Sequence, residues 1–305
     1  MDAPRHTART VAVAGARGFI GTGLTAVLEA AGERVLRIGR GGAVDVEWDP
    51  ARGKLDPHAL EGVHAVVNLA GEPIDQRWTA DARRRIIESR VQSTGLLART
   101  LAEMSSGPRV FVSMSAIGIY GDRGDDVLDE RSPPGEGFLA DVVREWEAAA
   151  EPARAAGLRV IHPRTGVVLH PSGGALERML PFFRLGVGGP IAGGRQWISW
   201  ISYADAVRGL AWLALDSTLN GVVNLTAPEP VRGAEFARAL GRAIHRPAVL
   251  PTPAFAIKAL YGRMGEETVV QGQRVLPRRL LDAGFEFAHR TIDHALADAF
   301  QPVAS

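Results

Sequence analysis

The sequence of 305 residues contains no cysteine and only two lysines, Lys54 and Lys258. Without thiols, disulfide bridges, cysteine nucleophiles and thiolate metal ligands are excluded. No uninterrupted apolar run reaches ten residues, whereas a membrane-spanning helix needs about 20. Residues 1–9 lack the apolar core of a secretory signal peptide. We therefore expect a cytoplasmic protein that does not associate with membranes.

Neither sign of charge dominates, because 35 basic residues face 34 acidic ones. This balance gives no reason to expect a nucleic-acid partner. The run 83–85 of three arginines lies between Asp81 and Glu88, which is typical of a solvated helix face. His289 and His294 are five residues apart, a spacing that does not align them on one helix face, so we expect no metal. The expected partner is a small-molecule substrate, and a homodimer stays open.

Glycine, in contrast, is abundant, and its most informative cluster follows the first apolar run. Residues 11–21 predict a buried strand, a turn with Gly15, Gly18 and Gly21, and a helix N-terminus. The first glycine allows the turn, the second lets the backbone approach phosphates, and the third lets the helix pack on the strand. The free N–H groups and partial positive charge of a helix N-terminus suit a pyrophosphate. We predict a dinucleotide site; the alternative is an ordinary strand-to-helix turn.

Apolar segments alternate with helical patterns along the first half of the chain. The predicted strands are 10–14, 34–38, 64–69, 109–114 and 159–162, and the predicted helices are 20–31, 79–104 and 139–156. Strands alternating with helices at this spacing indicate βαβ units. The expected fold class is therefore α/β, a Rossmann-type doubly wound parallel sheet that binds its ligand at the carboxyl ends of the strands.

The end of the second predicted strand indicates which nucleotide binds. An acidic residue there binds the ribose hydroxyls of NAD, whereas an arginine accepts the 2′-phosphate of NADP. Segment 36–40 contains no acid and ends in Arg40, and Arg17 can reach the same phosphate from the glycine turn. We therefore predict NADP(H) rather than NAD(H), although Arg40 can also be an ordinary exposed arginine. The predicted contacts are Gly15, Ala16, Arg17, Gly18, Phe19, Ile20, Gly21 and Arg40.

After about residue 170 the composition changes, with glycine-rich segments at 171–174 and 186–194 and frequent proline beyond 227. A predicted helix at 204–215 and a strand at 222–225 return to the sheet. We expect an NADP-binding Rossmann domain over 1–170, with return elements about 203–226. A smaller, mainly helical C-terminal cap then spans 171–202 and 227–305, and substrate lies between the two.

Further strings resemble one family. Residues 68–71, 113–121, 164–169 and 200–205 are similar to motifs of extended short-chain dehydrogenase/reductases. Residues 71–78, 89–94, 137–147 and 273–277 resemble the atypical subgroup called epimerase family proteins, or nucleoside-diphosphate-sugar epimerases. The resemblance covers essentially the whole chain and implies an NADP-dependent oxidoreductase or epimerase, with a sugar nucleotide as one candidate substrate. In this subgroup the C-terminal part is a domain of unknown function.

The chemistry of the wider family does not carry over directly. Ordinary members use a Tyr-x-x-x-Lys pair, in which the lysine lowers the tyrosine pKa from about 10. No tyrosine of this chain has a lysine four residues later. Alignment on Trp146-Glu147 places Leu139 near the tyrosine position and Val143 near the lysine position. The subgroup often has cysteine at the latter position and an arginine in place of an upstream asparagine, which Arg90 matches.

Three residues are candidates for handling protons instead. Ser115, the likeliest match to the family serine, can hydrogen-bond a substrate oxygen, or can satisfy local backbone groups. Tyr120 can exchange a proton if a cation such as Arg90 lies close, or it packs on its loop. Glu72, together with Arg77, can form a proton relay or bind substrate, or make a surface ion pair.

The nicotinamide half of the cofactor is expected to contact the ends of the central strands. The predicted contacts are Leu69, Ala70, Gly71, Arg90, Ser115 and Arg164. A bidentate donor at Arg90 can hold a ribose hydroxyl or a substrate carboxylate, although Arg90 and Arg164 can equally be structural ion pairs. Trp197 and Trp200 either wall a substrate pocket or belong to the core.

The sequence is compatible with three functions. The first is an NADP(H)-dependent oxidoreductase or epimerase on a small polar substrate. The second, motivated by the missing Tyr-x-x-x-Lys pair, is an NADP(H)-binding sensor or partner-binding protein without turnover. The third is an isomerase that uses other groups and keeps the nucleotide as a structural element. Hydride chemistry on the cofactor needs orientation, electrostatics and a proton route from the protein. The three functions therefore differ in whether, and through which residues, the protein supplies that proton route.

Overall fold

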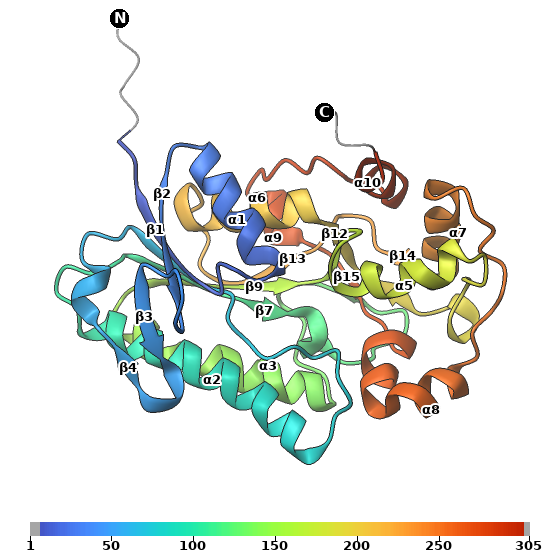
Figure 1. Ribbon diagram of the computed structural model, residues 1–305, viewed down its shortest axis with the longest axis horizontal. Helices are drawn as coiled ribbons and strands as arrows, with labels where there is room; N and C mark the ends of the chain where they lie inside the picture. Colours follow the sequence, from blue (N-terminus) through green and yellow to red (C-terminus); the bar gives the residue numbers. More distant parts are fainter. Residues whose placement is uncertain (1–6, 302–305) are drawn as a thin grey trace, which may run out of the picture.

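A nine-stranded sheet lies at the centre of the computed structural model, which describes residues 7–301 (Figure 1). The segments 1–6 and 302–305 lie outside the described residues. The interpretation that residues 1–9 lack a signal-peptide core therefore stays a prediction. The strand order is β13-β9-β6-β5-β1-β2-β3-β4, with β7 beside β9. The strands are β1 (Thr10–Ala14), β2 (Arg34–Gly39), β3 (Val46–Asp49), β4 (Lys54–Leu55), β5 (Ala65–Asn68), β6 (Val110–Ser113), β7 (Ser115–Ala116), β9 (Arg159–Thr165) and β13 (Gly221–Leu225).

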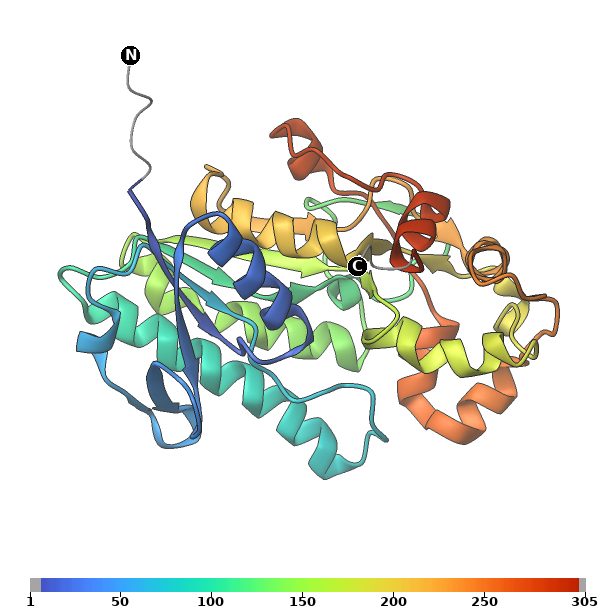
Figure 2. The ribbon, with the colours of Figure 1, turned by 45° about the horizontal axis from the view of Figure 1, so that its top comes forward.

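Pairing in this sheet is parallel except between β3 and β4, and helices cover both faces. This arrangement confirms the α/β, Rossmann-type expectation. One face carries α1 (Phe19–Ala30) and α6 (Tyr203–Leu215), which lie side by side (Figure 2). The other carries α2 (Ala80–Glu103), α3 (Phe138–Ala148) and α4 (Glu151–Ala155).

Alternation along β1 explains why both faces are covered. Successive side chains of a strand point to opposite faces. Val11 and Val13 pack in the cluster that includes Leu24 and Leu28 of α1. Ala12 and Ala14 pack in the cluster that includes Leu97 of α2. All four strand residues are fully buried, which is typical of the strands of a parallel sheet covered on both sides.

Helix bounds differ from the expected ones mainly at 139–156. The structure has two helices there, and Pro152 stands in the first turn of the second. Proline lacks the N–H that a continuing helix needs, so it favours a new start. The short strands β3 and β4 were not predicted, since two to four residues give no clear periodicity.

The remaining elements, called the second layer, are β8 (Val127–Leu128), β10 (Val167–Leu169), α5 (Gly174–Arg184), β11 (Trp197–Ile198), β12 (Trp200–Ser202), β14 (Val231–Arg232), α7 (Gly233–Ala243), α8 (Ala254–Gly265), β15 (Arg274–Val275), α9 (Arg278–Asp282) and α10 (Ile292–Ala299). Leu280 of α9 packs with the core of the central sheet, whereas α5, α7 and α10 share a second apolar core. Leu169 and Trp200 already belong to this core. The domain boundary at 170 stays a prediction, and Trp200 is a core residue.

The second layer lies at the carboxyl end of the central sheet (Figure 1). A Cβ on Gly173, just before α5, would lie 2.3 Å from the ring of Phe19, the first residue of α1. The Phe19 ring also packs against His170 and Tyr203. The turn after β1 therefore faces the start of α5 directly. Within residues 7–301, no helix combines the length and apolarity needed to span a bilayer.

Candidate functional site

The turn after β1 has no room for side chains at its glycines. Gly15 has a φ of +80°, which L side chains rarely adopt. A Cβ on Gly21 would lie 2.1 Å from the carbonyl oxygen of Gly15. The N–H of Gly18 donates to that same oxygen at 2.9 Å, and no side chain caps α1. The N–H groups of the first turn are therefore free to bind an anion.

The Arg17 side chain reaches the backbone at the end of β2, where Arg40 stands. The Nη2 atom of Arg17 donates to the carbonyl oxygens of Arg40, at 3.4 Å, and of Gly41, at 3.2 Å. Both side chains are exposed. Among residues 7–301 neither guanidinium forms an ion pair with a carboxylate. The structure thus places the Arg17 guanidinium against the backbone of Arg40 and Gly41, and the joint role of the two arginines at a 2′-phosphate stays a prediction.

The segment after β5 lies beside the glycine turn. Asn68 is buried, and its Nδ2 donates to Ser93 Oγ at 3.3 Å and to Thr94 Oγ1 at 3.0 Å. The Oδ1 atom of Asn68 accepts the N–H of Ala70 at 3.1 Å. A Cβ on Gly15 would lie 3.0 Å from the backbone nitrogen of Ala70. The predicted contacts Leu69 and Ala70 are therefore held against the turn, and Gly71 follows them in the chain.

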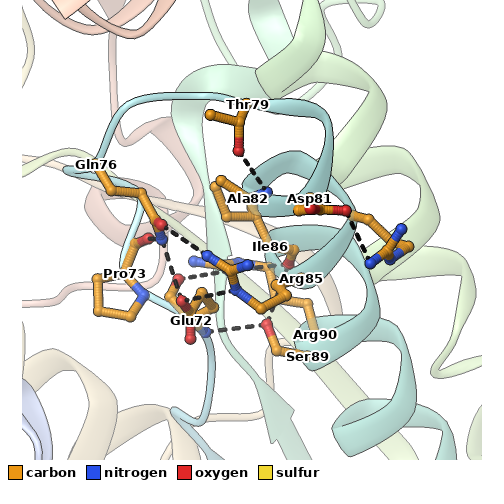
Figure 3. A network of polar contacts seen from close by, with 11 residues as sticks. Glu72, Pro73, Gln76, Thr79, Asp81, Ala82, Arg85, Ile86, Ser89 and Arg90 are labelled. Atoms are coloured by element: carbon orange, nitrogen blue, oxygen red, sulfur yellow. Dashed lines mark hydrogen bonds and ion pairs between the residues drawn. The ribbon is translucent and has the colours of Figure 1, made fainter.

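Arg90 lies beside Gly71, and backbone carbonyls hold it there (Figure 3). Its Nη1 donates to the oxygens of Glu72, at 2.9 Å, and Ile86, at 3.1 Å. Its Cζ lies 5.0 Å from the ring centre of Trp146. Burial lowers the pKa of Arg90 to about 10, which leaves the guanidinium charged at neutral pH. In the described part of the chain it has no ion pair, so it suits an anionic or polar ligand.

The Glu72 carboxylate turns toward α2 (Figure 3). Its Oε1 accepts from Gln76 Nε2 at 3.2 Å and lies 3.5 Å from Arg85 Nε. The backbone N–H of Glu72 donates to Ser89 Oγ at 2.9 Å. These contacts fix the loop on the helix. The proton role expected for Glu72 stays a prediction, and this geometry lends it no support.

Ser115 and Arg164 face one carboxylate. The two residues are neighbours in the register of β7 and β9. Ser115 Oγ donates to Glu147 Oε1 at 2.6 Å. Arg164 donates from Nε to Oε1 and from Nη2 to Oε2, both at 2.9 Å. Burial opposes ionisation of Glu147, but the hydrogen bonds and charge of Arg164 outweigh it and hold its pKa below the usual range. Glu147 is therefore an anion.

Tyr120 belongs to the same network but has no exposed surface. Its hydroxyl donates to Asn224 Oδ1 at 2.7 Å and accepts from Arg164 Nη1 at 3.1 Å. Burial raises the pKa of Tyr120 although Arg164 opposes the shift. Arg90 is not among its contacts. This geometry favours a structural role, and the proton role expected for Tyr120 stays an unsupported prediction.

Glu147 is the residue that sequence reasoning missed. The chain shows it only as an acid next to Trp146. Its one signal is its spacing of four residues from the buried Val143, which places it on the apolar face of α3. An acid at such a position needs a buried partner, but the sequence does not reveal that the partner is Arg164.

Two family models match this chain. One, described as the NAD dependent epimerase/dehydratase family, matches residues 11–225. The other, a domain of unknown function (DUF1731), matches residues 252–299. The first match contains the glycine turn, the strands β5 and β6, and the contacts of Ser115 and Arg164 with Glu147.

The chain belongs to the NAD dependent epimerase/dehydratase family.

Known members of this epimerase/dehydratase family resemble the chain over nearly its whole length. The epimerase family protein Mb2239 of Mycobacterium bovis is 45% identical over 293 residues, 95% of this chain and 97% of the relative. The crystal structure of human epimerase family protein SDR39U1 (isoform2) with NADPH has a TM-score of 0.88 at 35% identity. That comparison covers 95% of this chain and 98% of the human one.

A third family member carries a more specific name. The crystal structure described as the nucleoside-diphosphate sugar epimerase from Corynebacterium glutamicum has a TM-score of 0.77 at 34% identity. The match covers 95% of this chain but 58% of that one. The predicted subgroup, epimerase family proteins with a C-terminal DUF1731, is thereby confirmed. Among the described residues no cluster of three or more His, Asp or Glu is arranged to hold a metal.

Proposed function

We propose that this protein is an NADP(H)-dependent oxidoreductase or epimerase that acts on a small polar substrate at the carboxyl end of the sheet. The observation that carries the proposal is the approach of Arg17 to Arg40 beside a glycine turn that excludes side chains. Two guanidinium groups without carboxylate partners suit a 2′-phosphate, whereas the ribose hydroxyls of NAD favour an acid there. The NADPH in the structure of the human relative supports this choice.

In this proposal each side chain has a limited task. The glycine turn and the first turn of α1 bind the pyrophosphate. Bound nicotinamide supplies a hydride donor or acceptor. Arg90 orients an anionic or hydroxyl-bearing group beside Gly71. Ser115, fixed by Glu147, contacts the reacting oxygen. The name of the Corynebacterium glutamicum structure makes a nucleoside-diphosphate sugar the first substrate class to examine.

Deuterium transfer tests the proposal. NADPH labelled separately on each face of C4 is incubated with the protein and a panel of small carbonyl compounds and keto-sugar nucleotides. We expect deuterium to leave one face only and to appear in a product. Saturable NADPH binding with deuterium retained on both faces across the panel contradicts turnover.

That negative outcome supports a second candidate, an NADP(H)-binding sensor. The observation in its favour is that Tyr120 is fully buried with a raised pKa, while the positions of the missing pair hold Leu139 and Val143. No described tyrosine–lysine pair supplies a proton route. A sensor must bind its partner differently when it holds the oxidised or the reduced nucleotide. Parallel pull-down experiments with NADP⁺ and with NADPH measure the amount of partner bound in each state.

A further inference from the structure

Nearly all large apolar side chains that the described part of the chain exposes come from two segments of the second layer. Residues 182–187 include the end of α5, and residues 249–261 include the loop before α8 and most of that helix. Of nine such side chains, eight belong to these segments, and Val127 is the ninth. The eight, called the apolar patch, are 42–77% exposed: Phe182, Leu185, Val187, Val249, Leu250, Phe255, Leu260 and Tyr261.

The two segments lie side by side, at the opposite end of the molecule from β3 and β4 (Figure 1). The backbone N–H of Leu250 donates to the carbonyl oxygen of Gly188 at 3.3 Å. The Nε atom of Arg246 donates to the carbonyl oxygen of Arg184 at 3.2 Å. Helix α8 begins directly after this loop, at Ala254. The members of the apolar patch are therefore neighbouring parts of one surface.

The apolar patch is larger than the apolar area that a monomeric protein usually leaves uncovered. For side chains of roughly 150–250 Å² each, exposures of 42–77% amount to an area on the order of 800 Å². The largest apolar patch of a typical monomer is about 300–600 Å², and larger ones mark contacts with a protein or a membrane. A partner is therefore expected to cover this surface.

The surroundings of the apolar patch are basic. Segments 178–204 and 236–265 contain three and five arginine or lysine residues, and neither contains an aspartate or a glutamate. Four of these basic residues pair with acids outside the two segments. Within residues 7–301, Arg184, Arg238 and Arg246 form no ion pair. Charge complementarity therefore favours a partner with negative charge.

A hollow of about 540 Å³ lies beside the apolar patch, between α7 and the loop that follows it. Arg238, Arg242 and Arg246 line this hollow together with His245, and Val249 of the apolar patch belongs to its wall. Guanidinium groups match the geometry of phosphate. The hollow therefore suits the phosphate of a molecule whose apolar part lies against the patch.

We propose that the apolar patch is a peripheral docking surface for a bilayer that contains anionic phospholipids. Aromatic and aliphatic side chains flanked by arginine and lysine are typical of surfaces that lie in the membrane interface. A second copy of this chain would set the same basic surface against itself, and like charges oppose such a contact. A peptide needs a groove or a strand edge, whereas a bilayer accepts side chains from a helix end, a loop and another helix together.

This proposal revises the expectation that the protein does not associate with membranes. That expectation rested on the absence of long apolar runs, which argues against a spanning helix but not against contact with the interface of a bilayer. None of the eight patch residues is among those proposed to hold the nucleotide or the substrate. The inference is therefore independent of the proposed function.

Vesicle sedimentation with the full chain tests the proposal. One set of vesicles contains phosphatidylcholine alone, and the other contains equimolar phosphatidylcholine and phosphatidylglycerol. We expect the wild-type protein to bind the anionic vesicles at least about tenfold more strongly, because several cations flank the apolar patch. Added salt should weaken this binding, since it screens the charges.

Two double variants separate the apolar from the electrostatic contribution. Leu185→Glu with Phe255→Glu should weaken binding to anionic vesicles at least about tenfold, since these side chains, 77% and 75% exposed, no longer enter the interface. Arg238→Gln with Arg246→Gln should reduce the preference for phosphatidylglycerol and leave binding to neutral vesicles unchanged.

Matched controls carry the same substitutions elsewhere on the surface. Val127→Glu alters the one exposed large apolar residue outside the patch in the described chain. Arg52→Gln with Arg131→Gln removes two guanidinium groups whose side chains are 86% and 91% exposed. Both controls should bind vesicles as the wild-type protein does. Thermal unfolding of every variant checks that the fold is intact.

The proposal is overturned if the wild-type protein does not bind anionic vesicles, or binds neutral ones equally well. Binding that survives Leu185→Glu with Phe255→Glu overturns it too. Sedimentation velocity identifies the other occupant: a wild-type dimer that ignores vesicles, and that this double variant dissociates, assigns the apolar patch to a second copy. Deuterium transfer from NADPH is measured without vesicles, so the proposed function stands or fails separately.

Discussion

The Arg178 guanidinium of α5 lies 2.5 Å from the Asp75 carboxylate in the loop after β5. The same helix begins against Phe19 at the start of α1. Helix α5 therefore contacts both the start of α1 and the loop after β5. If the dinucleotide binds between these two segments, as proposed, we expect the ion pair to slow its release.

Breaking this ion pair should speed the release of NADPH. Both side chains are largely exposed, so the pair contributes at most about 1 kcal/mol, and Asp75→Arg should raise the dissociation rate about two- to fivefold. The double variant Asp75→Arg with Arg178→Asp should restore it. Stopped-flow fluorescence of bound NADPH measures both rates. As a control, the ion pair between Arg242 of α7 and Asp293 of α10 is disrupted in the same way. A similar change in the dissociation rate there would show that the loss of charge alone is responsible.

Arg90 should matter for ligand binding more than its neighbour Arg85. Hydrogen bonds to charged groups contribute about 1.5–3 kcal/mol, so we expect Arg90→Gln to weaken NADPH or substrate binding about ten- to hundredfold. Arg85 bonds the exposed loop through Glu72 and Gln76 (Figure 3), and Arg85→Gln should leave affinity unchanged. Calorimetric titration of both variants measures the effect, and equal losses would contradict the role given to Arg90.

Tyr120→Phe should lower stability while leaving NADPH affinity unchanged. The lost hydroxyl leaves Asn224 Oδ1 and Arg164 Nη1 without a partner in a buried network, at a cost of about 1–3 kcal/mol. Denaturant unfolding measures this cost. Tyr261, which is exposed, offers a control, because Tyr261→Phe should have no effect. A variant of Tyr120 that is fully stable but loses deuterium transfer would instead make this residue catalytic.

The stability of the fold should fall in mild acid because of His162. Burial lowers the pKa of His162 to about 4, against about 6.5 in an unfolded chain. Between these values the unfolded state binds more protons, so stability is lost as the pH falls, by about 1.4 kcal/mol per pH unit. His162→Gln should flatten that part of the profile, and His294→Gln, on the surface, should not. An unchanged slope in His162→Gln would assign the acid sensitivity to other groups.

The fold was predictable from the sequence because its signals are local. Apolar runs at β1, β5 and β6 and the glycines at 15, 18 and 21 define the parallel sheet and its turn without knowledge of distant residues. Pro152 breaks the expected helix at 139–156 by a local rule, but the two-residue strand β4 depends on pairing with β3. Short elements gain their structure from tertiary contacts, and sequence periodicity does not show these.

The candidate site was predictable only in part, for the same reason. The proximity of Arg17 to Arg40 follows from the topology of a Rossmann unit. The partners of Ser115 and Tyr120 are 32 and 104 residues away, and nothing in the local sequence names Glu147 or Asn224. The direction in which the Glu72 carboxylate points also depends on Arg85 and Gln76, not on its place after β5.

The most direct test of the account is the ratio of NADPH to NADH affinity in the wild-type protein. Fluorescence titration gives both dissociation constants. We predict that NADPH binds at least about tenfold tighter, since charge-assisted bonds to the 2′-phosphate contribute about 1.5–3 kcal/mol. Arg17→Ala with Arg40→Ala should bring the two constants together by weakening NADPH alone. Equal affinities in the wild type, or tighter binding of NADH, would contradict the proposal that Arg17 and Arg40 select NADP(H).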